Sequence, residues 1–234
     1  MIDSKMDTTY DHVILGGGMG GLVIGSLLAY AGKSVCLIEA NSDLGGHAYT
    51  INAGEYKFCH DVQYLMGCQE GGPMRSFLDR IGLGSRIKFN ALDPSGYDMI
   101  CIEGKKIRIP SGMENYLKVL IGLYPQQEKE LTAYFELEKK IFKEADGYNK
   151  VLTKKDISKA PWKYLTIIRY INSTLEDIFN KFKFPAELRA VLAARIGNLS
   201  ASPREVSFLI YAAMDVAYSE SAAFSGTRNG IPDR

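Results

Sequence analysis

An apolar run followed by closely spaced glycines constrains the fold of this chain more than any other feature. Val13–Leu15 leads into Gly16, Gly18 and Gly21, in the spacing Gly-x-Gly-x-x-Gly. The first glycine allows a sharp turn out of a strand, the second lets backbone approach a phosphate, and the third lets a helix lie close to the strands. The N-terminus of that helix offers unpaired N–H groups to an anion. The pattern therefore predicts a strand, a tight turn and a helix that together bind a pyrophosphate.

A second strand and an acid complete this pattern. Small and apolar residues continue as far as Gly32, and the apolar run Val35–Ile38 then ends at Glu39. An acid about 20 residues beyond the glycines lies where the ribose of a dinucleotide needs an acceptor. Glycines alone also fit an ordinary turn, but the strand, the helix and the acid in register favour a parallel βαβ unit. We therefore expect residues 11–39 to begin an α/β, Rossmann-like domain.

The residues after Glu39 bear on which dinucleotide binds. Ala40 is followed, a few residues on, by the pair Gly45-Gly46 and then by His47. A Gly-Gly pair in this place resembles the extended motif of FAD-binding flavoproteins, in which backbone there also touches the cofactor. Those proteins usually continue with Arg or Lys, so His47 weakens the charge argument and leaves the backbone argument intact. The pair favours FAD over NAD(P), with an ordinary loop between strands as the alternative.

Composition argues against several classes of protein. The chain has 234 residues, enough for one sizeable core or for one domain and part of another. A net charge of +1 without a long basic block argues against nucleic acid as a partner. The N-terminal residues are polar and show no secretory signal, and no charge-free apolar run is long enough to span a bilayer. With four cysteines and no Cys-x-x-Cys pair, a reducing, cytoplasmic setting fits best.

Turn signals and periodicity divide the chain into two parts. Hairpins are expected around Ala53–Glu55 and Glu103–Lys105, and a short helix is expected to begin at Pro73 between them. The second part has a helical period instead. We expect a dinucleotide-binding domain over residues 1–110 and a mainly helical substrate domain over residues 111–234.

Caps and prolines mark the expected helices of the second part. Ser111, with Glu114 three residues on, has the spacing of a capping box and predicts a helix start. Apolar residues between Leu131 and Phe142 recur with a period nearer 3.6 than 2. One helix is expected to end at Pro125, and others are expected to follow Pro161, Pro185 and Pro203.

Taken in order, these segments resemble the phytoene desaturase, carotenoid isomerase and retinol saturase group of FAD-dependent oxidoreductases. The resemblance rests on ILGGGMGGLVIGSLLAYAGKSVCLIEA, LGGHAYT, YKFCHDVQYLMG, YDMI and IPSGMENYLKVLIGLYPQQEKELTAYF. It covers most of residues 11–142 and, more loosely, residues 186–230. The opening motif is shared with amine oxidases and many other flavoproteins. The strand pair that leads into SGMENY, followed by Tyr-Pro and an acidic helix, is more specific to the enzymes that act on polyenes.

The resemblance implies FAD as the cofactor, with NAD(P) less favoured, and a long apolar polyene as the substrate. The implied activity is desaturation, saturation or isomerisation of a carotenoid or retinoid. The flavin carries the chemistry in such enzymes, so we assign no catalytic residue, and the three histidines lack the spacing of metal ligands. The implied cofactor-binding residues are Gly16, Gly18, Gly20, Gly21, Glu39, Ala40, Gly45, Gly46, His47, Gln63 and Tyr64.

The chain departs from the family pattern in sequence and in length. Cys59-His60-Asp61 stands where many relatives carry Asp-x-Gly, and Gln63 stands where some retinol saturases carry His. Relatives also continue to a second FAD-contacting segment near their C-terminus. We therefore interpret the chain as an N-terminal portion, whose site a C-terminal partner chain would complete.

This interpretation leaves two other functions open. One is a non-catalytic nucleotide-binding remnant, and the other is a flavin amine oxidase-like enzyme, against which the SGMENY region counts.

A truncated helical domain is also expected to leave apolar residues exposed for lack of packing partners, among them Phe208, Ile210 and Tyr211.

The segment at residues 161–171 combines apolar bulk with Trp162, Lys163 and Arg169. Relatives draw their substrate from membranes, so the resemblance implies that an amphipathic helix here serves as a peripheral docking patch. Packing within the helical domain explains the same residues without a membrane. Membrane association therefore stands beside the expected cytoplasmic location as an alternative.

Overall fold

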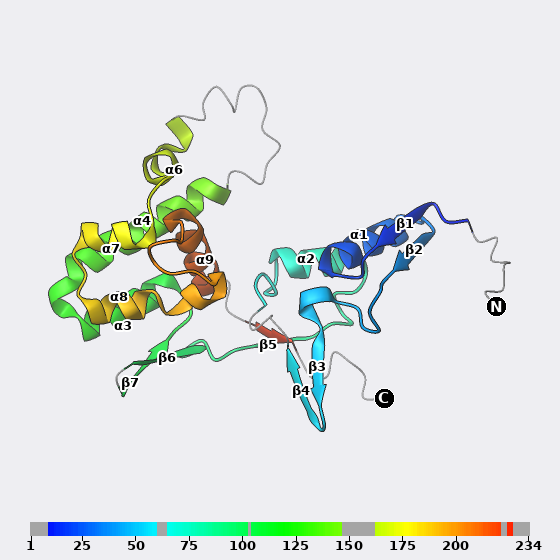
Figure 1. Cartoon of the computed structure of the whole chain (residues 1–234), viewed down its shortest axis with the longest axis horizontal. Coiled ribbons are helices and arrows are strands. Elements are labelled where there is room, and N and C mark those ends of the chain that lie inside the picture. The colour runs from blue at the N-terminus through cyan, green and yellow to red at the C-terminus, as the bar shows by residue number, and fades with distance from the viewer. Residues whose placement is uncertain (1–8, 60–64, 103, 147–161, 221–223, 227–234) are drawn as a thin grey trace. The chain divides into compact units, whose positions relative to one another are not determined.

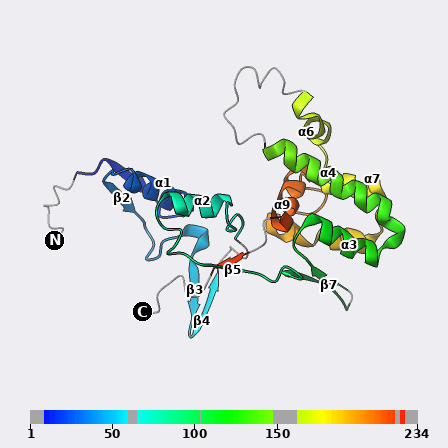
Figure 2. The same ribbon diagram turned by 180° about the vertical axis from the view of Figure 1, so that it is seen from behind.

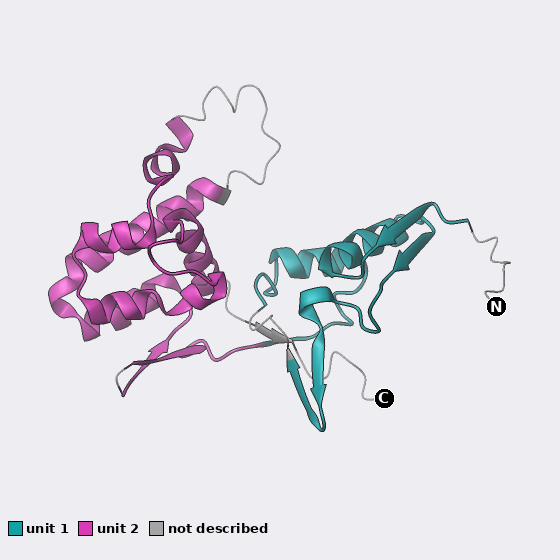
Figure 3. Ribbon diagram, viewed as in Figure 1, with its two compact units in different colours: residues 1–90, 225–234 teal, residues 91–224 magenta. Residues whose placement is uncertain are grey.

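The computed structural model of the chain falls into two compact units (Figures 1 and 3). Unit 1 comprises residues 1–90 and 225–234, and unit 2 comprises residues 91–224. The chain leaves and re-enters unit 1 within two short strands that pair with each other, β5 (Phe89–Ala91) and β8 (Phe224–Gly226). The structure describes residues 9–59, 65–102, 104–146, 162–220 and 224–226.

Unit 1 begins with the predicted parallel βαβ arrangement. β1 (His12–Leu15) and β2 (Val35–Ile38) pair in parallel, and α1 (Met19–Tyr30) connects them. The helix lies close to the strands because it presents glycine to them. A Cβ added to Gly25 would lie 3.3 Å from Cδ1 of Ile14. The strand–helix–strand prediction is confirmed.

A hairpin and a short helix follow in unit 1. β3 (Thr50–Ala53) and β4 (Tyr56–Cys59) pair antiparallel and turn at Gly54, whose φ of +62° suits glycine. α2 (Pro73–Arg80) begins at the predicted proline and is followed by Gly82 at φ +73°. Local turn chemistry was therefore sufficient to predict both elements.

The second hairpin belongs to unit 2. β6 (Asp98–Ile102) and β7 (Lys105–Ile109) pair antiparallel. Ile107 and Ile109 on one face of β7 are buried. The hairpin thus contributes to the core of the helical unit, and the units divide at residue 90 instead of at the predicted domain boundary of residue 110.

The remaining described elements of unit 2 are mainly helical. The aromatic ring of Tyr134 lies at its centre, with ring centroids 5.6 Å from Phe184 and 6.0 Å from Phe208. The described helical segments are α3 (Met113–Leu123), η2 (Pro125–Gln127), α4 (Glu128–Asp146), α6 (Leu165–Tyr170), α7 (Leu175–Phe182), α8 (Ala186–Leu192), η4 (Ala194–Leu199) and α9 (Phe208–Glu220).

Figures 1 and 2 show α4 and α9 side by side in this unit. The positions predicted from Pro125, Pro185 and Pro203 are confirmed, although α9 begins only at Phe208. Pro161 lies outside the described residues. No helix in the described ranges is long and apolar enough to cross a membrane.

Two predictions about unit 2 are wrong. Ser111 is not the N-cap of α3, because Gly112 holds that position at φ +89° without a side-chain cap. The C-terminus of α9 supplies the cap instead. Gly112 donates its N–H to the carbonyl of Ser219 at 2.7 Å, and Met113 donates to Oε1 of Glu220 at 3.0 Å.

The second error concerns the apolar residues of α9. Phe208 and Tyr211 are buried, because α4, α6 and α7 pack against this helix within unit 2. Ile210, at 58% exposure, is the one of the three whose predicted exposure is confirmed.

The sequence prediction also missed α7, although Thr174 and Asp177 form a capping box at the start of this helix.

Candidate dinucleotide-binding site

The three glycines of the Gly-x-Gly-x-x-Gly motif have different surroundings. Gly16 has a φ of +98°, and its N–H donates to the carbonyl of Ile38 at 2.8 Å, which closes the turn onto β2. A Cβ on Gly21 would lie 2.1 Å from the carbonyl oxygen of Gly16, so only glycine lets the helix approach this closely. Gly18 has ordinary extended angles and open space of at least 4 Å where a Cβ would stand.

The open space at Gly18 lies at the N-terminus of α1. Gly18 is the N-cap, and the first bond within the helix runs from the N–H of Leu22 to the carbonyl of Gly18. The N–H groups of the first turn therefore have no partner inside the helix, and that turn contains no acid. This end of the helix carries partial positive charge and suits an anion.

Glu39 lies at the end of β2 and faces the same loop. Its Oε2 accepts the N–H of Gly17 at 2.7 Å, and its Oε1 accepts the backbone N–H and Nδ2 of Asn41, each at 2.9 Å. These hydrogen bonds, first from the Asn41 backbone and then from Gly17, hold the pKa of Glu39 below 4.5. An ionised carboxylate retains acceptor capacity on each oxygen, as a ribose hydroxyl requires.

The Gly45-Gly46 pair lies against the glycine loop. Gly45 donates its N–H to the carbonyl of Gly17 at 2.8 Å and forms an isolated bridge with Gly18. Gly45 and Gly46 have φ values of +119° and +58°, and a Cβ on Gly46 would lie 3.1 Å from Cα of Gly18. The pair is therefore more than a connection between strands, because its backbone packs on the loop that precedes α1.

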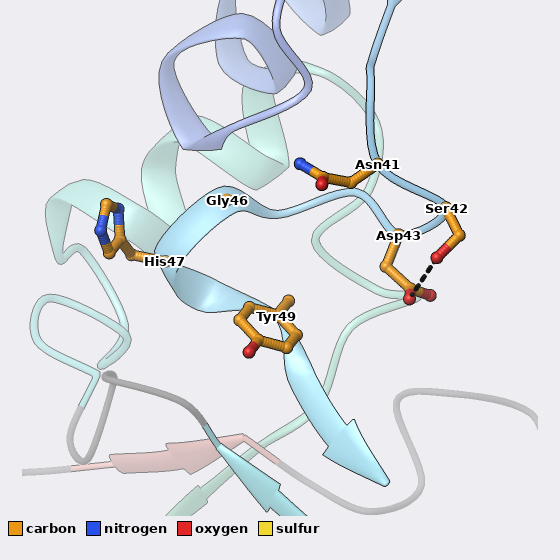
Figure 4. A pocket seen from close by; sticks show the side chains of 6 residues that line it. All are labelled: Asn41, Ser42, Asp43, Gly46, His47 and Tyr49. Carbon is orange, nitrogen blue, oxygen red and sulfur yellow. Dashed lines mark hydrogen bonds between the residues drawn. The ribbon is translucent and has the colours of Figure 1, made fainter.

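A cavity of about 490 Å³ opens beside this pair (Figure 4). Its lining comes from the loop after β2 and from η1 (Gly46–Ala48). The lining residues are Asn41, Ser42, Asp43, Gly46, His47 and Tyr49.

The structure gathers most of the predicted site at the carboxyl ends of β1 and β2, where doubly wound sheets bind their ligands. Gln63 and Tyr64 lie outside the described residues, so their assignment stays a prediction. The predicted residues brought together are Gly16, Gly18, Gly20, Gly21, Glu39, Ala40, Gly45, Gly46 and His47.

Two residues that shape this site escaped the sequence prediction. Asn41 holds the carboxylate of Glu39 through its backbone N–H and its side chain. Its position two residues after the acid could have indicated this local hydrogen bonding. Leu44 packs on the glycine loop, since a Cβ on Gly17 would lie 2.4 Å from its Cδ2. No sequence pattern indicates that contact.

A buried polar cluster in unit 2 was also missed. Arg195 donates from Nη1 to Oδ1 of Asp215 at 2.6 Å and to Oγ of Ser219 at 3.1 Å, and from Nη2 to the hydroxyl of Tyr97. Glu138 is fully buried nearby, and burial, then the Asp215 carboxylate, raise the pKa of Glu138 well above 4.5. The sequence did contain an indication of this cluster, because Glu138 falls on the same helix face as the apolar residues between Leu131 and Phe142.

Residues 14–81 match the family described as the NAD(P)-binding Rossmann-like domain. All-trans-retinol 13,14-reductase from Danio rerio is 27% identical over 89% of this chain and 36% of its own length. The rat protein of that name is 25% identical over 94% of this chain and 38% of its own length. The chain thus spans just over a third of the length of these relatives. A probable flavin-containing monoamine oxidase A from Dictyostelium discoideum is 28% identical over 53% of the chain and 26% of its own length.

Solved structures share the fold. Wild-type putrescine oxidase bound to putrescine has a TM-score of 0.58 at 18% identity, over 94% of this chain and 47% of that one. Cyclohexylamine oxidase from Brevibacterium oxydans IH-35A has a TM-score of 0.56 at 19% identity, over 93% of this chain and 46% of that one. The comparisons confirm the Rossmann-like fold and the predicted resemblance to the retinol saturase group of FAD-dependent oxidoreductases.

Proposed function

We propose that the chain is the nucleotide-binding portion of an FAD-dependent oxidoreductase. The main support for this proposal is the open space at Gly18. This space lies at the N-terminus of α1, where an anion is favoured, and it lets a phosphate approach the backbone closely. Glu39 adds an ionised acceptor on one side of the loop, and Gly45 adds a second stretch of backbone against Gly17 and Gly18. These residues fit the adenosine pyrophosphate half of FAD.

Each part of the site has a separate task toward this half of the cofactor. The first turn of α1 binds the pyrophosphate through N–H groups, and Glu39 orients the ribose through its hydroxyls. Gly16 and Gly21 hold the loop and the helix in place. When bound, FAD supplies the redox chemistry of the reaction.

FAD is favoured over NAD(P) by the packing of Gly45 and Gly46 on the glycine loop. The flavin-containing amine oxidases among the relatives also support a flavin. We infer a retinoid-like or carotenoid-like polyene as the substrate, supported by the similarity to retinol 13,14-reductases over most of this chain. An amine oxidase-like activity is the second candidate, since those oxidases share the fold.

The binding proposal is tested by titrating FAD into a chain extended to the length of the relatives and following flavin fluorescence. A Gly18→Val side chain would fill the space that the phosphate needs, so we expect at least tenfold weaker binding. Gly122→Val is the matched control, because Gly122 in α3 of the other unit also has open space at its Cβ. Equal affinity of the two variants, or no saturable binding by the wild type, would refute the placement.

The substrate proposal is tested on a chain extended to the length of the relatives. Flavin reduction or reoxidation is followed with all-trans-retinol, a carotenoid and a primary amine. Turnover of the amine alone would favour the amine oxidase alternative. Flavin binding without turnover of any of them would favour a non-catalytic nucleotide-binding protein.

We also propose peripheral membrane contact through residues 161–171. Packing explains one face of this segment, since Tyr164, Thr166 and Tyr170 are buried. The other face is apolar, more than half exposed and accompanied by Lys163 and Arg169, as an interfacial helix requires. Its exposed residues are Trp162, Leu165, Ile168 and Ile171.

Trp162 offers a direct test, because it is the single tryptophan of the chain. Vesicles containing anionic lipid should shift its fluorescence to shorter wavelength, and Ile168→Lys should abolish the shift. Exposed Ile210→Lys in α9 is the control and should leave it unchanged. A spectrum that vesicles do not alter would rule out docking through this face.

A further inference from the structure

We propose that Arg169 and Lys181 form a binding site for the phosphate groups of anionic lipid headgroups. The two cations come from α6 and α7, and both lie on the ring of one tyrosine, Tyr170. This inference rests on the proposed membrane contact through residues 161–171. It names the lipid chemistry that this contact recognises, and it adds Lys181, a residue outside that segment.

Tyr170 brings the two cations together. The guanidinium carbon of Arg169 lies 5.7 Å from the centroid of the Tyr170 ring, and Nζ of Lys181 lies 4.7 Å from the same centroid. Lys181 also donates a hydrogen bond to the hydroxyl of Tyr170. The tyrosine is buried, whereas Arg169 and Lys181 are exposed. The ring therefore holds both charges at the surface, where a ligand can reach them.

The neighbouring acids are engaged elsewhere. Glu144, in the last turn of α4, accepts two backbone N–H groups of α6, each at 3.0 Å. In α7, Asp177 accepts the N–H of the N-cap residue at 2.9 Å, and Glu176 pairs with Arg204 at 2.7 Å. In the described part of the chain, no ion pair joins an acid to either cation on the tyrosine ring. Two like charges that share one ring without a counter-ion attract an anion.

Arg169 adjoins the apolar face that we propose for membrane contact. In α6 it follows Leu165 by four residues, and Ile168 follows Leu165 by three, so the three side chains share one side of the helix. All three are exposed. An interfacial helix immerses its apolar face at the boundary of the acyl chains and keeps its cations among the headgroups. Charge complementarity therefore favours an anionic bilayer over a zwitterionic one.

The test measures vesicle binding by flotation, with the chain extended to the length of the relatives. One set of vesicles contains phosphatidylcholine alone, and the other contains equal parts of phosphatidylcholine and phosphatidylglycerol. We expect tighter binding to the anionic vesicles, and this advantage should shrink as salt is added. Arg169→Gln leaves the hydrogen bond between Lys181 and Tyr170 in place and should weaken binding to the anionic vesicles by about fivefold. Adding Lys181→Gln should weaken it by about fivefold more.

Two controls separate charge from folding. The double variant Arg169→Lys, Lys181→Arg keeps both charges and should bind as the wild type does. Lys118→Gln removes an exposed cation from α3, which Figures 1 and 2 show away from α6 within unit 2, and it should leave binding unchanged. Equal melting temperatures verify that each variant keeps the fold.

The outcomes distinguish this inference from the membrane contact on which it rests. Equal binding of the wild type to both sets of vesicles would overturn the phosphate site and leave the membrane contact standing. The same conclusion would follow if the double glutamine variant bound anionic vesicles as tightly as the wild type, or if the charge-retaining variant lost binding. Failure of the wild type to bind either set would instead refute the membrane contact, and this inference with it.

Discussion

Oε2 of Glu39 accepts the backbone N–H of Gly17 at 2.7 Å, and this bond joins the end of β2 to the loop that follows β1. The same carboxylate is the expected acceptor for the ribose. Glu39 therefore both shapes the glycine loop and binds the ligand that the loop receives. Asn41 holds the other carboxylate oxygen and leaves one orientation for the group.

Glu39→Ala should weaken FAD binding by about tenfold or more, because a hydrogen bond to a charged group is lost. Fluorescence titration measures the loss, and Glu114→Ala on α3 of unit 2 serves as the control. Since the pKa of Glu39 is lowered, its bonds stabilise the fold above about pH 4.5, and this contribution disappears as the pH falls through the lower folded pKa. An affinity change below twofold would show that the carboxylate does not face the ribose.

Gly21→Ala should destabilise unit 1 by about 1–3 kcal/mol, because the new Cβ would lie 2.1 Å from the carbonyl oxygen of Gly16. Gly20→Ala is the matched control in the same helical turn, with open space at its Cβ. It should be neutral or stabilising by up to about 1 kcal/mol, since alanine favours helix. Urea denaturation compares the two, and equal stabilities would contradict the close approach of α1 to the loop.

Glu138→Gln should stabilise unit 2 increasingly as the pH rises above the ordinary glutamate value of 4.5. Because burial raises the folded pKa of Glu138, the folded protein is expected to keep this proton at pH values at which the unfolded chain releases it, and this one group then lowers the free energy of unfolding by up to about 1.4 kcal/mol per pH unit. Denaturation at about pH 5 and pH 8 measures the difference between variant and wild type. A difference that does not grow with pH would mean that Glu138 is ionised in the folded state. Glu136→Gln, at an exposed position of α4, should show no such trend.

Thr174→Ala should cost about 1 kcal/mol, because Thr174 accepts the N–H of Asp177 and Asp177 accepts the N–H of Thr174 at the start of α7. Thr132→Ala on the exposed face of α4 is the control, and it should leave stability unchanged or slightly raised. Thermal unfolding of both variants gives the comparison. Equal melting temperatures for the two would contradict the capping role.

Local patterns determined the βαβ start, both hairpins and most helix positions of this protein. Each depends on residues close in sequence, such as Gly54 in its turn or Pro185 before α8, and so the chain itself carries the information. The positions of the glycines and of Glu39 were also predictable, because strand, turn, helix and acid follow one another within about 30 residues.

Only the tertiary structure decided the contacts between distant segments. The cap of α3 comes from Glu220, more than a hundred residues away, and Ser111 is left out although its local spacing was correct. Arg195 and Asp215 meet in a buried pair for the same reason, with Glu138 held beside them. Backbone donors and buried charges take whichever partner packing brings near, because an unsatisfied group in the interior costs free energy. The sequence shows which groups need a hydrogen-bond partner. Which residue becomes that partner depends on the tertiary packing.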